Sequence, residues 1–320
     1  MSVLTSDPRS PGERADTASW AAGTVQRVRG AVDAWLATST RLDLVLLLTL
    51  VLVLIEPPPT RLAGLVDLVV VAGLVVRPLA RLPLFWFSLV AVWAVTSLPV
   101  HWASADNHKW LLVYWTLAVG IALTTSRPLE HLAVTARLLI GLVFLFATAW
   151  KLMSPDFPSG AFFHFTLLTD IRFSDIAEVF GGLPEGSTAA NAAAIDAWDD
   201  PTVPPAALEL ADGPRVAAVG LVMAVGTIVV EGLVALAFLV PERWRLSRLR
   251  ELALCLFVLA TYPLAPVVGF GWVLVTMALA SSRLRRPVGE LLYVSAFLAI
   301  FAFQGLDVVW RALRAVLPGV

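Results

Sequence analysis

Long apolar runs alternate with short polar segments along most of this chain. A helix needs about 20 mostly apolar residues to cross the roughly 30 Å hydrocarbon layer of a bilayer. The runs are residues 42–55, 62–76, 82–100, 110–125, 132–150, 216–240, 252–280 and 288–309. The run 252–280 is too long for one ordinary helix, and Pro263 and Pro266 interrupt it, so we expect two helices there. The pattern therefore predicts an all-α fold, a polytopic membrane helix bundle of about nine transmembrane helices.

The distribution of arginine predicts the orientation of these helices. Cytoplasmic loops carry an excess of Lys and Arg. With a cytoplasmic N-terminus, the inner segments hold Arg27, Arg29, Arg41, Arg77, Arg81, Arg127, Arg243, Arg245, Arg248, Arg250, Arg283, Arg285 and Arg286. The long segment between the fifth and sixth runs is acidic instead. We therefore expect a multi-pass protein of the plasma (inner) membrane, with the N-terminus inside, the C-terminus outside and Lys151 on the extracytoplasmic side.

The runs divide the chain into five predicted parts. Residues 1–40 form a cytoplasmic N-terminal tail, 41–151 the first five transmembrane helices, 152–214 an extracytoplasmic acidic loop, 215–311 helices six to nine and 312–320 a C-terminal tail. In the loop, FFHFTLLTDIRFSDIAEVF (162–180) alternates aromatic and polar residues at helical spacing, which is typical of an interfacial helix. The Ala, Gly, Pro and Asp residues of 181–214 predict a flexible insertion.

Composition agrees with a membrane protein and excludes several functions. Hydrophobic residues make up 58% of the chain and charged residues 15%, whereas a soluble domain carries roughly a quarter charged residues. The net charge of −1 argues against a nucleic-acid partner. The single cysteine, Cys255, excludes an internal disulfide, a CxxC redox pair and a thiolate metal cluster. His101, His131 and His164 show no metal-ligand spacing with carboxylates, so no metal site is predicted.

The use of lysine marks the first candidate site. Among 23 basic residues, the only lysines are Lys109 and Lys151, and both fall at predicted outer ends of helices. A buried amine can lose its proton, whereas a guanidinium effectively cannot. Lys151 lies in the last turn of the fifth predicted helix, before the turn sequence SPDFPSG. Two interpretations stay open for it, a snorkelling anchor at the membrane interface and a chemically active amine.

Three further residues accompany Lys151. Asn107 is the expected N-cap of the fourth helix, which places His108 in its first turn and, by topology, on the same face as Lys151. A lone interfacial histidine is more often structural than catalytic. Glu231 falls at the middle of the sixth helix, where a carboxylate is costly. For Glu231 we favour a hydrogen bond to another helix, such as to a Thr or Trp side chain, over a supporting role at a site; Asp307 is a similar, less buried case.

At these residues the sequence resembles the vitamin K-dependent gamma-carboxylases and their bacterial relatives, the HTTM (horizontally transferred transmembrane) domain proteins. The resembling segments are NHKWLLVYW (107–115), FATAWKLMSPDFPSGAFF (146–163), Glu231 with the later PERWR, and VGFGWVLVTMALASS (268–282). The resemblance covers most of residues 42–282. The sequence departs from the carboxylases at Trp150, where they have a second lysine, and at Phe157, where they have tryptophan.

The resemblance implies a function and a set of residues. Lys151 would be the base that deprotonates a reduced quinone of the vitamin K or menaquinol type, and His108 its partner. Asn107, Lys109, Trp150, Gly160, His164 and Glu231 would bind the ligand or support the site. The expected activity is a carboxylase-like (carbon–carbon lyase) reaction or another quinol-linked oxidative modification, with a secreted peptide or protein as possible substrate and membrane lipid as surroundings.

Two other functions remain open from the sequence. In the first function, the membrane core is non-catalytic and serves export, maturation or immunity for a secreted peptide that docks on the acidic loop. The second function is that of a small-solute transporter. It is disfavoured because the chain has no visible inverted repeat and few intramembrane charges.

Overall fold

The computed structural model of the chain describes residues 26, 30, 39–57, 60, 62–96, 106–198, 209–262 and 267–303. The chain divides into two compact units, Met1–Leu44 and Val45–Val320. The packing and the sites described below belong to the second unit. His101 and Asp307 lie outside the described residues.

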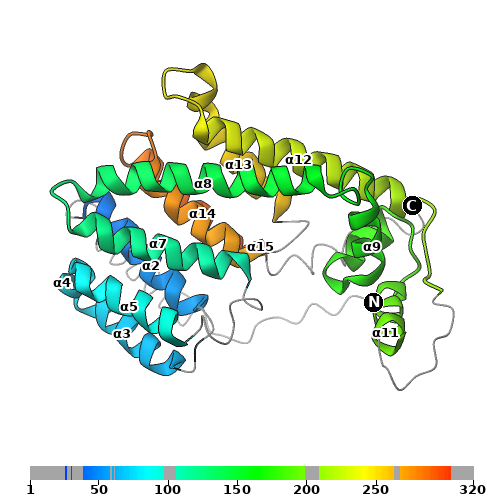
Figure 1. Ribbon diagram of the computed structural model, residues 1–320, viewed down its shortest axis with the longest axis horizontal. Helices are drawn as coiled ribbons and strands as arrows, with labels where there is room; N and C mark the ends of the chain where they lie inside the picture. The colour runs from blue at the N-terminus through cyan, green and yellow to red at the C-terminus, as the bar shows by residue number, and fades with distance from the viewer. Residues whose placement is uncertain are drawn as a thin grey trace, which may run out of the picture. The chain divides into compact units, whose positions relative to one another are not determined.

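The described residues form helices and turns, without a strand, and the all-α prediction is confirmed for them (Figure 1). The α-helices are α2 (Arg41–Ile55), α3 (Ala63–Val75), α4 (Arg77–Ala80), α5 (Pro83–Thr96), α7 (Asn107–Leu123), α8 (Pro128–Met153), α9 (Ala161–Thr169), α10 (Ser174–Val179), α11 (Ser187–Trp198), α12 (Val216–Leu239), α13 (Arg250–Thr261), α14 (Val268–Ser281) and α15 (Val288–Phe303). Two 3-10 helices, η1 (Ile171–Phe173) and η2 (Arg245–Leu249), precede α10 and α13.

Each predicted apolar run coincides with a helix, including the two expected on either side of residues 263–266. Only α8, with 26 residues, and α12, with 24, are long and apolar enough to cross a membrane by themselves among the described helices. The other apolar helices have 12 to 17 residues. At 1.5 Å per residue a 12-residue helix is about 18 Å long, shorter than the hydrocarbon layer. The number of membrane spans and their orientation therefore stay predictions.

Helices α8 and α12 lie side by side along their length and run antiparallel (Figure 1). Gly141 of α8 meets the end of α12, where an added Cβ would lie 2.6 Å from Leu239 Cδ2. Nearer the middle of α12, Gly232 faces Thr148 of α8. These two contacts show that α8 and α12 run in opposite directions. Glycine at these positions allows the two backbones to approach closely, as is common between helices in membranes.

Helix α14 forms the most buried part of this bundle. It packs against α7, α8 and α15, and every residue from Gly271 to Ser281 is buried. The indole of Trp272 donates a hydrogen bond to the carbonyl of Phe297 on α15. Its surroundings explain why α14 is apolar on all sides, the composition expected of a fully enclosed helix.

The loop between α8 and α12 folds into a small helical layer, α9 to α11. Leu167, Phe173, Ile176, Leu183 and Val216 are the larger members of its apolar core. Asn191 of α11 fastens the layer, because its side chain donates to the carbonyls of residues 168 and 211 and accepts from the amide of residue 211.

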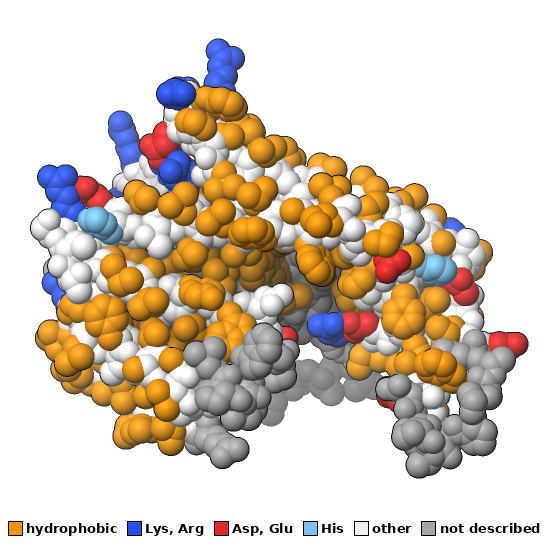
Figure 2. All heavy atoms as spheres, viewed as in Figure 1, with side chains coloured by type: hydrophobic (Ala, Val, Ile, Leu, Met, Phe, Trp, Pro, Cys, Tyr) orange, Lys and Arg blue, Asp and Glu red, His pale blue; other side chains and the backbone are white. Residues whose placement is uncertain are grey.

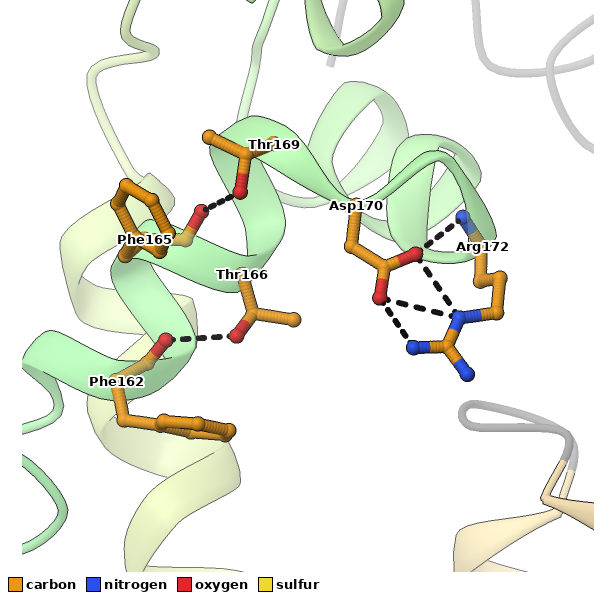
Figure 3. A network of polar contacts seen from close by, with 6 residues as sticks. All are labelled: Phe162, Phe165, Thr166, Thr169, Asp170 and Arg172. Atoms are coloured by element: carbon orange, nitrogen blue, oxygen red, sulfur yellow. Dashed lines mark hydrogen bonds and ion pairs between the residues drawn. The ribbon is translucent and has the colours of Figure 1, made fainter. Parts of the chain in front are cut away.

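Two details of this loop differ from the sequence-based expectations. The predicted flexible insertion contains α11, since STAANAAAIDAW is rich in alanine, the strongest helix former. The expected single interfacial helix is interrupted at Asp170, whose carboxylate accepts from the backbone amide and the guanidinium of Arg172 (Figure 3). This interaction lowers the pKa of the Asp170 carboxyl below its usual value. On α9 the hydroxyls of Thr166 and Thr169 donate back to the carbonyls of Phe162 and Phe165 (Figure 3).

Candidate functional site

Lys151 and Glu231 form a buried ion pair between α8 and α12. Lys151 Nζ lies 2.5 Å from Glu231 Oε2, and the two side chains are 17% and 10% exposed within the protein. The antiparallel packing of α8 and α12 brings the last turn of one helix to the middle of the other. The amine therefore points into the protein, toward α12.

An aromatic wall, formed by Phe157, Phe162 and Phe163, reaches the amine through the ring of Phe157. Lys151 Nζ lies 5.4 Å from the centroid of the Phe157 ring, within the range of a cation–π interaction. Phe157 stacks on Phe162 at 4.7 Å and meets Phe163 edge-on at 5.4 Å. The turn expected from SPDFPSG is present after α8. It folds Phe157 back over Lys151.

Gly160 ends this turn in a conformation that favours glycine. Its φ of +81° lies in the left-handed region, and an added Cβ would lie 2.8 Å from the Cα of Leu221 on α12. The resemblance implies a role for this glycine. In the structure its role is to bring α9 and the aromatic wall against α12.

Two hydroxyl groups beside the pair have no hydrogen-bond partner among the described residues, Thr148 Oγ1 and Tyr262 Oη. Thr148 precedes Lys151 by one turn of α8 and faces Gly232. Tyr262, only 1% exposed, follows α13 and lies close enough to Glu231 to interact with its charge. Buried hydroxyls are usually hydrogen-bonded. These two can therefore still form hydrogen bonds that no described residue of the protein provides.

His108 belongs to a second cluster, with Glu56 and Lys109. His108 Nε2 lies 3.5 Å and Lys109 Nζ 3.7 Å from Glu56 Oε2, and Lys109 also donates to the carbonyl of Pro57. The hydrogen bond with His108, aided by the charge of Lys109, holds the pKa of the Glu56 carboxyl below its usual value of 4.5 even though burial opposes the shift. Gly269 of α14 makes room for this cluster, because an added Cβ would lie 2.5 Å from His108 Nε2.

The structure keeps the two clusters apart. The described contacts of His108 are with Glu56 and Gly269, at the level where Phe144 of α8 meets Phe270 of α14. Lys151 lies seven residues beyond Phe144, which is about 10 Å further along the helix. Each of the two residues is paired with a carboxylate of its own, His108 with Glu56 and Lys151 with Glu231.

The remaining predicted site residues take different positions. Asn107 is the first residue of α7 and not its cap, because Asp106 holds the N-cap position. Trp150 is 74% exposed and points away from the pair. His164 Nε2 lies 3.0 Å from Asp212 Oδ2, outside both clusters. Glu231 makes the expected hydrogen bond to another helix, but its partner is Lys151 and not a Thr or Trp.

Sequence reasoning missed Glu56 and Tyr262. Glu56 carried a signal, since it closes the first apolar run just before three prolines. Tyr262 carried none, because its place beside Glu231 depends on how α13 packs on α12. Within the part of the chain that the structure describes, no three His, Cys, Asp or Glu side chains could hold a metal ion together.

Comparison of the chain with protein-family models, with curated proteins and with solved structures finds no match. The function must therefore be argued from the two clusters and from the exposed surface.

Proposed function

We propose that this chain is a multi-pass membrane protein of the HTTM or vitamin K-dependent carboxylase-like class, in which Lys151 acts as a base toward a reduced quinone. The observation that carries the proposal is the inward orientation of the Lys151 amine. It pairs with Glu231 below an aromatic wall, at the end of a helix long enough to span a bilayer. The proposed location is the plasma membrane, with Lys151 near the extracytoplasmic side.

The exposed surface supports a membrane location. Only 28% of the apolar window of α8 and 33% of that of α12 is buried within the protein. Val222, Val225, Val229 and Leu236 of α12 are each at least half exposed. Figure 2 shows hydrophobic side chains over most of the face formed by α8 and α12. A contiguous apolar surface of this extent is unfavourable in water and suits hydrocarbon.

The residues around the pair fit a quinone-type ligand. The stacked Phe157 and Phe162 offer a flat apolar surface to a ring, and the unpartnered hydroxyls of Thr148 and Tyr262 suit the oxygen atoms of such a ring. When bound, a reduced quinone supplies an acidic hydroxyl and, with oxygen, a strong base. These features support a lipid-soluble ligand that carries polar oxygens.

Lys151 and Glu231 can take up a proton together. For Lys151 to act as the base, the ionisable proton of the pair must first lie on Glu231, which leaves a neutral amine beside a protonated carboxyl. When a ligand O–H bond breaks, its proton passes to the amine. This step leaves an ammonium at Lys151 and a negative charge on the ligand oxygen, and the attraction between the two charges stabilises the product.

Quinone content of the purified protein tests the proposal. We expect lipid extraction and mass spectrometry to find stoichiometric menaquinone or ubiquinone in wild type, and its loss in Lys151→Arg and Glu231→Gln. Arg127→Lys is the control, because Arg127 also pairs with a glutamate, Glu130, but lies at the start of α8, away from Lys151; this variant should retain the quinone. His108→Ala tests the partner role in the same assay. Ordinary phospholipid alone in wild type would refute the quinol hypothesis.

A second candidate function follows from the same ion pair. The Lys151 amine is already bound by Glu231, as in a purely structural pair, so the chain could be a non-catalytic protein for export, maturation or immunity of a secreted peptide. Exchanging the charges, Lys151→Glu with Glu231→Lys, separates the two functions. A structural pair tolerates the exchange with little change in Tm and in partner-dependent function, whereas a base at Lys151 is lost because the amine moves to α12.

A further inference from the structure

An apolar groove lies between α13, α14 and α15, away from both clusters. Its volume is about 250 Å³, and it is lined by Cys255 and Val258 of α13, Val275 of α14, and Tyr293, Ala296 and Ala299 of α15, among other residues. Helix α13 packs on α12, and α15 packs on α14, but α13 and α15 have no comparable contact within the described chain. The groove is therefore a gap between two helices that no described side chain fills.

The outer faces of the two helices that flank the groove are exposed and apolar. Leu252, Leu256 and Leu259 of α13 and Leu291 and Leu298 of α15 are 47 to 66% exposed. Such faces suit the hydrocarbon region of a bilayer rather than water. A linear hydrocarbon chain matches the groove in polarity.

Unpaired arginines lie beyond one end of the groove. The connections before α13 and before α15 carry Arg243, Arg245, Arg248 and Arg285, which are exposed and form no ion pair with a described residue. Their neighbours differ, because Arg283 pairs with Glu242 and Arg286 with Glu290. In Figure 2 basic side chains gather along this edge, over the α12–α13 and α14–α15 connections.

A carboxylate at this end of the groove, Glu251, is already hydrogen-bonded within the protein. Glu251 accepts hydrogen bonds from Tyr293 Oη, from Ser282 Oγ and from the amide of Arg283. Its oxygens are thus occupied by donors of the protein, and the four arginines form no ion pair with Glu251 or with another described residue.

We propose that this groove binds one acyl chain of an anionic phospholipid whose phosphate is held by Arg248 and Arg285. Basic residues next to a membrane attract anionic lipid through charge, and the apolar gap adds a shape that ordinary surface attraction lacks. The lipid joins α13 to α15 and so completes the packing of the bundle. This site is independent of the proposed quinol chemistry at Lys151.

Lipid retention by the full-length protein tests the proposal. The protein is placed in nanodiscs of equimolar phosphatidylglycerol and phosphatidylcholine, released, and analysed by native mass spectrometry. We expect wild type to retain phosphatidylglycerol at least tenfold over phosphatidylcholine. The double variant Arg248→Gln/Arg285→Gln should lose that preference, while Arg127→Gln, an exposed arginine on another connection of the same edge, should keep it.

A substitution that fills the groove distinguishes a specific binding site from simple charge attraction at the surface. Ala299→Phe places a ring in the groove and should abolish retention, whereas Ala302→Phe, on an exposed position of the same helix, should not. Cys255 gives a second readout, because a bound chain should slow its alkylation by N-ethylmaleimide several-fold in phosphatidylglycerol relative to phosphatidylcholine. The proposal is overturned by equal retention of the two lipids in wild type, by undiminished retention in Ala299→Phe, or by equal alkylation rates.

Discussion

At the scale of single residues, the chemistry of this protein depends on what each charged side chain is paired with. The two lysines and the two glutamates Glu56 and Glu231 form two separate groups at one end of the bundle. A buried ion pair is held together strongly once formed, since removing one partner leaves an uncompensated charge in a poorly solvated place. Both groups are therefore sensitive to single substitutions and less sensitive to matched double ones.

The Lys151–Glu231 pair leads to a prediction about stability. Lys151→Met and Glu231→Leu, made singly, should each destabilise the protein by about 3–5 kcal/mol, because each leaves the other charge buried alone. The double variant should recover most of this loss. Thermal unfolding in detergent gives the stability of wild type, the two single variants and the double variant. Additive losses in the double variant would show that the two side chains do not interact.

Gly269 leads to a prediction about the His108 cluster. Gly269→Ala should cost about 1–3 kcal/mol, since its Cβ would lie 2.5 Å from His108 Nε2 and 3.2 Å from Glu56 Cδ. Gly64→Ala is the matched control, because Gly64 is likewise the second residue of its helix and an added Cβ there meets nothing within 4 Å. The control should be neutral or slightly stabilising. Equal effects of the two substitutions on Tm would contradict the close approach of His108 to α14.

At the scale of elements, the turn after α8 and the short helices that follow it position the aromatic wall. Gly220 of α12 allows α9 to come close, because an added Cβ would lie 2.7 Å from the backbone nitrogen of His164. Gly160 does the same from the other side. The contact between α9 and α12 thus depends on glycine in both partners, and with it the place of Phe157 above Lys151.

A pair of glycine substitutions tests this contact. Gly160 and Gly186 both have positive φ, at 81° and 76°, but only Gly160 is crowded by a neighbouring helix. Gly186→Ala should therefore cost only the conformational strain of about 1–2 kcal/mol, and Gly160→Ala clearly more. Unfolding in denaturant compares the two variants. A smaller loss for Gly160→Ala than for Gly186→Ala would be inconsistent with the packing described.

At the scale of the whole molecule, the proposed membrane location makes orientation the property that decides which compartment each site faces. The exposed arginines of the α7–α8, α12–α13 and α14–α15 connections share one edge of the second unit (Figure 2). Lys151 lies at the opposite end of α8 from the α7–α8 connection. Under the positive-inside rule, the edge with these arginines is expected to face the cytoplasm and Lys151 the other side.

The single cysteine makes the orientation straightforward to test. In a Cys255→Ser background, cysteine is placed at Ser126, between α7 and α8, or at Ser159, after α8; both positions are exposed. We expect a membrane-impermeant maleimide added to intact cells to label Ser159→Cys at once, and Ser126→Cys only after permeabilisation. The reverse pattern would invert the proposed topology, and labelling of both in intact cells would refute a transmembrane arrangement of α8.

The sequence by itself determined the long apolar helices of this protein, but not α11 or the interruption at Asp170. The apolar runs predict all the long helices, the break around residues 263–266 separates α13 from α14, and SPDFPSG predicts the end of α8. These features are local, since run length, proline and turn residues act over a few neighbours. The scarcity of lysine and the presence of a carboxylate within an apolar run likewise indicate Lys151 and Glu231 from the sequence alone.

Only the tertiary structure decided which of these residues meet. That Glu231 pairs with Lys151, 80 residues away, follows from the antiparallel register of α8 and α12, which glycine contacts set. That His108 pairs with Glu56 and not with Lys151 follows from the different lengths of α7 and α8, with 17 and 26 residues. The groove between α13 and α15 has no sequence signal, because it arises where two apolar helices pack on different partners. Pairing across a bundle depends on register and crossing of whole helices, which local patterns do not encode.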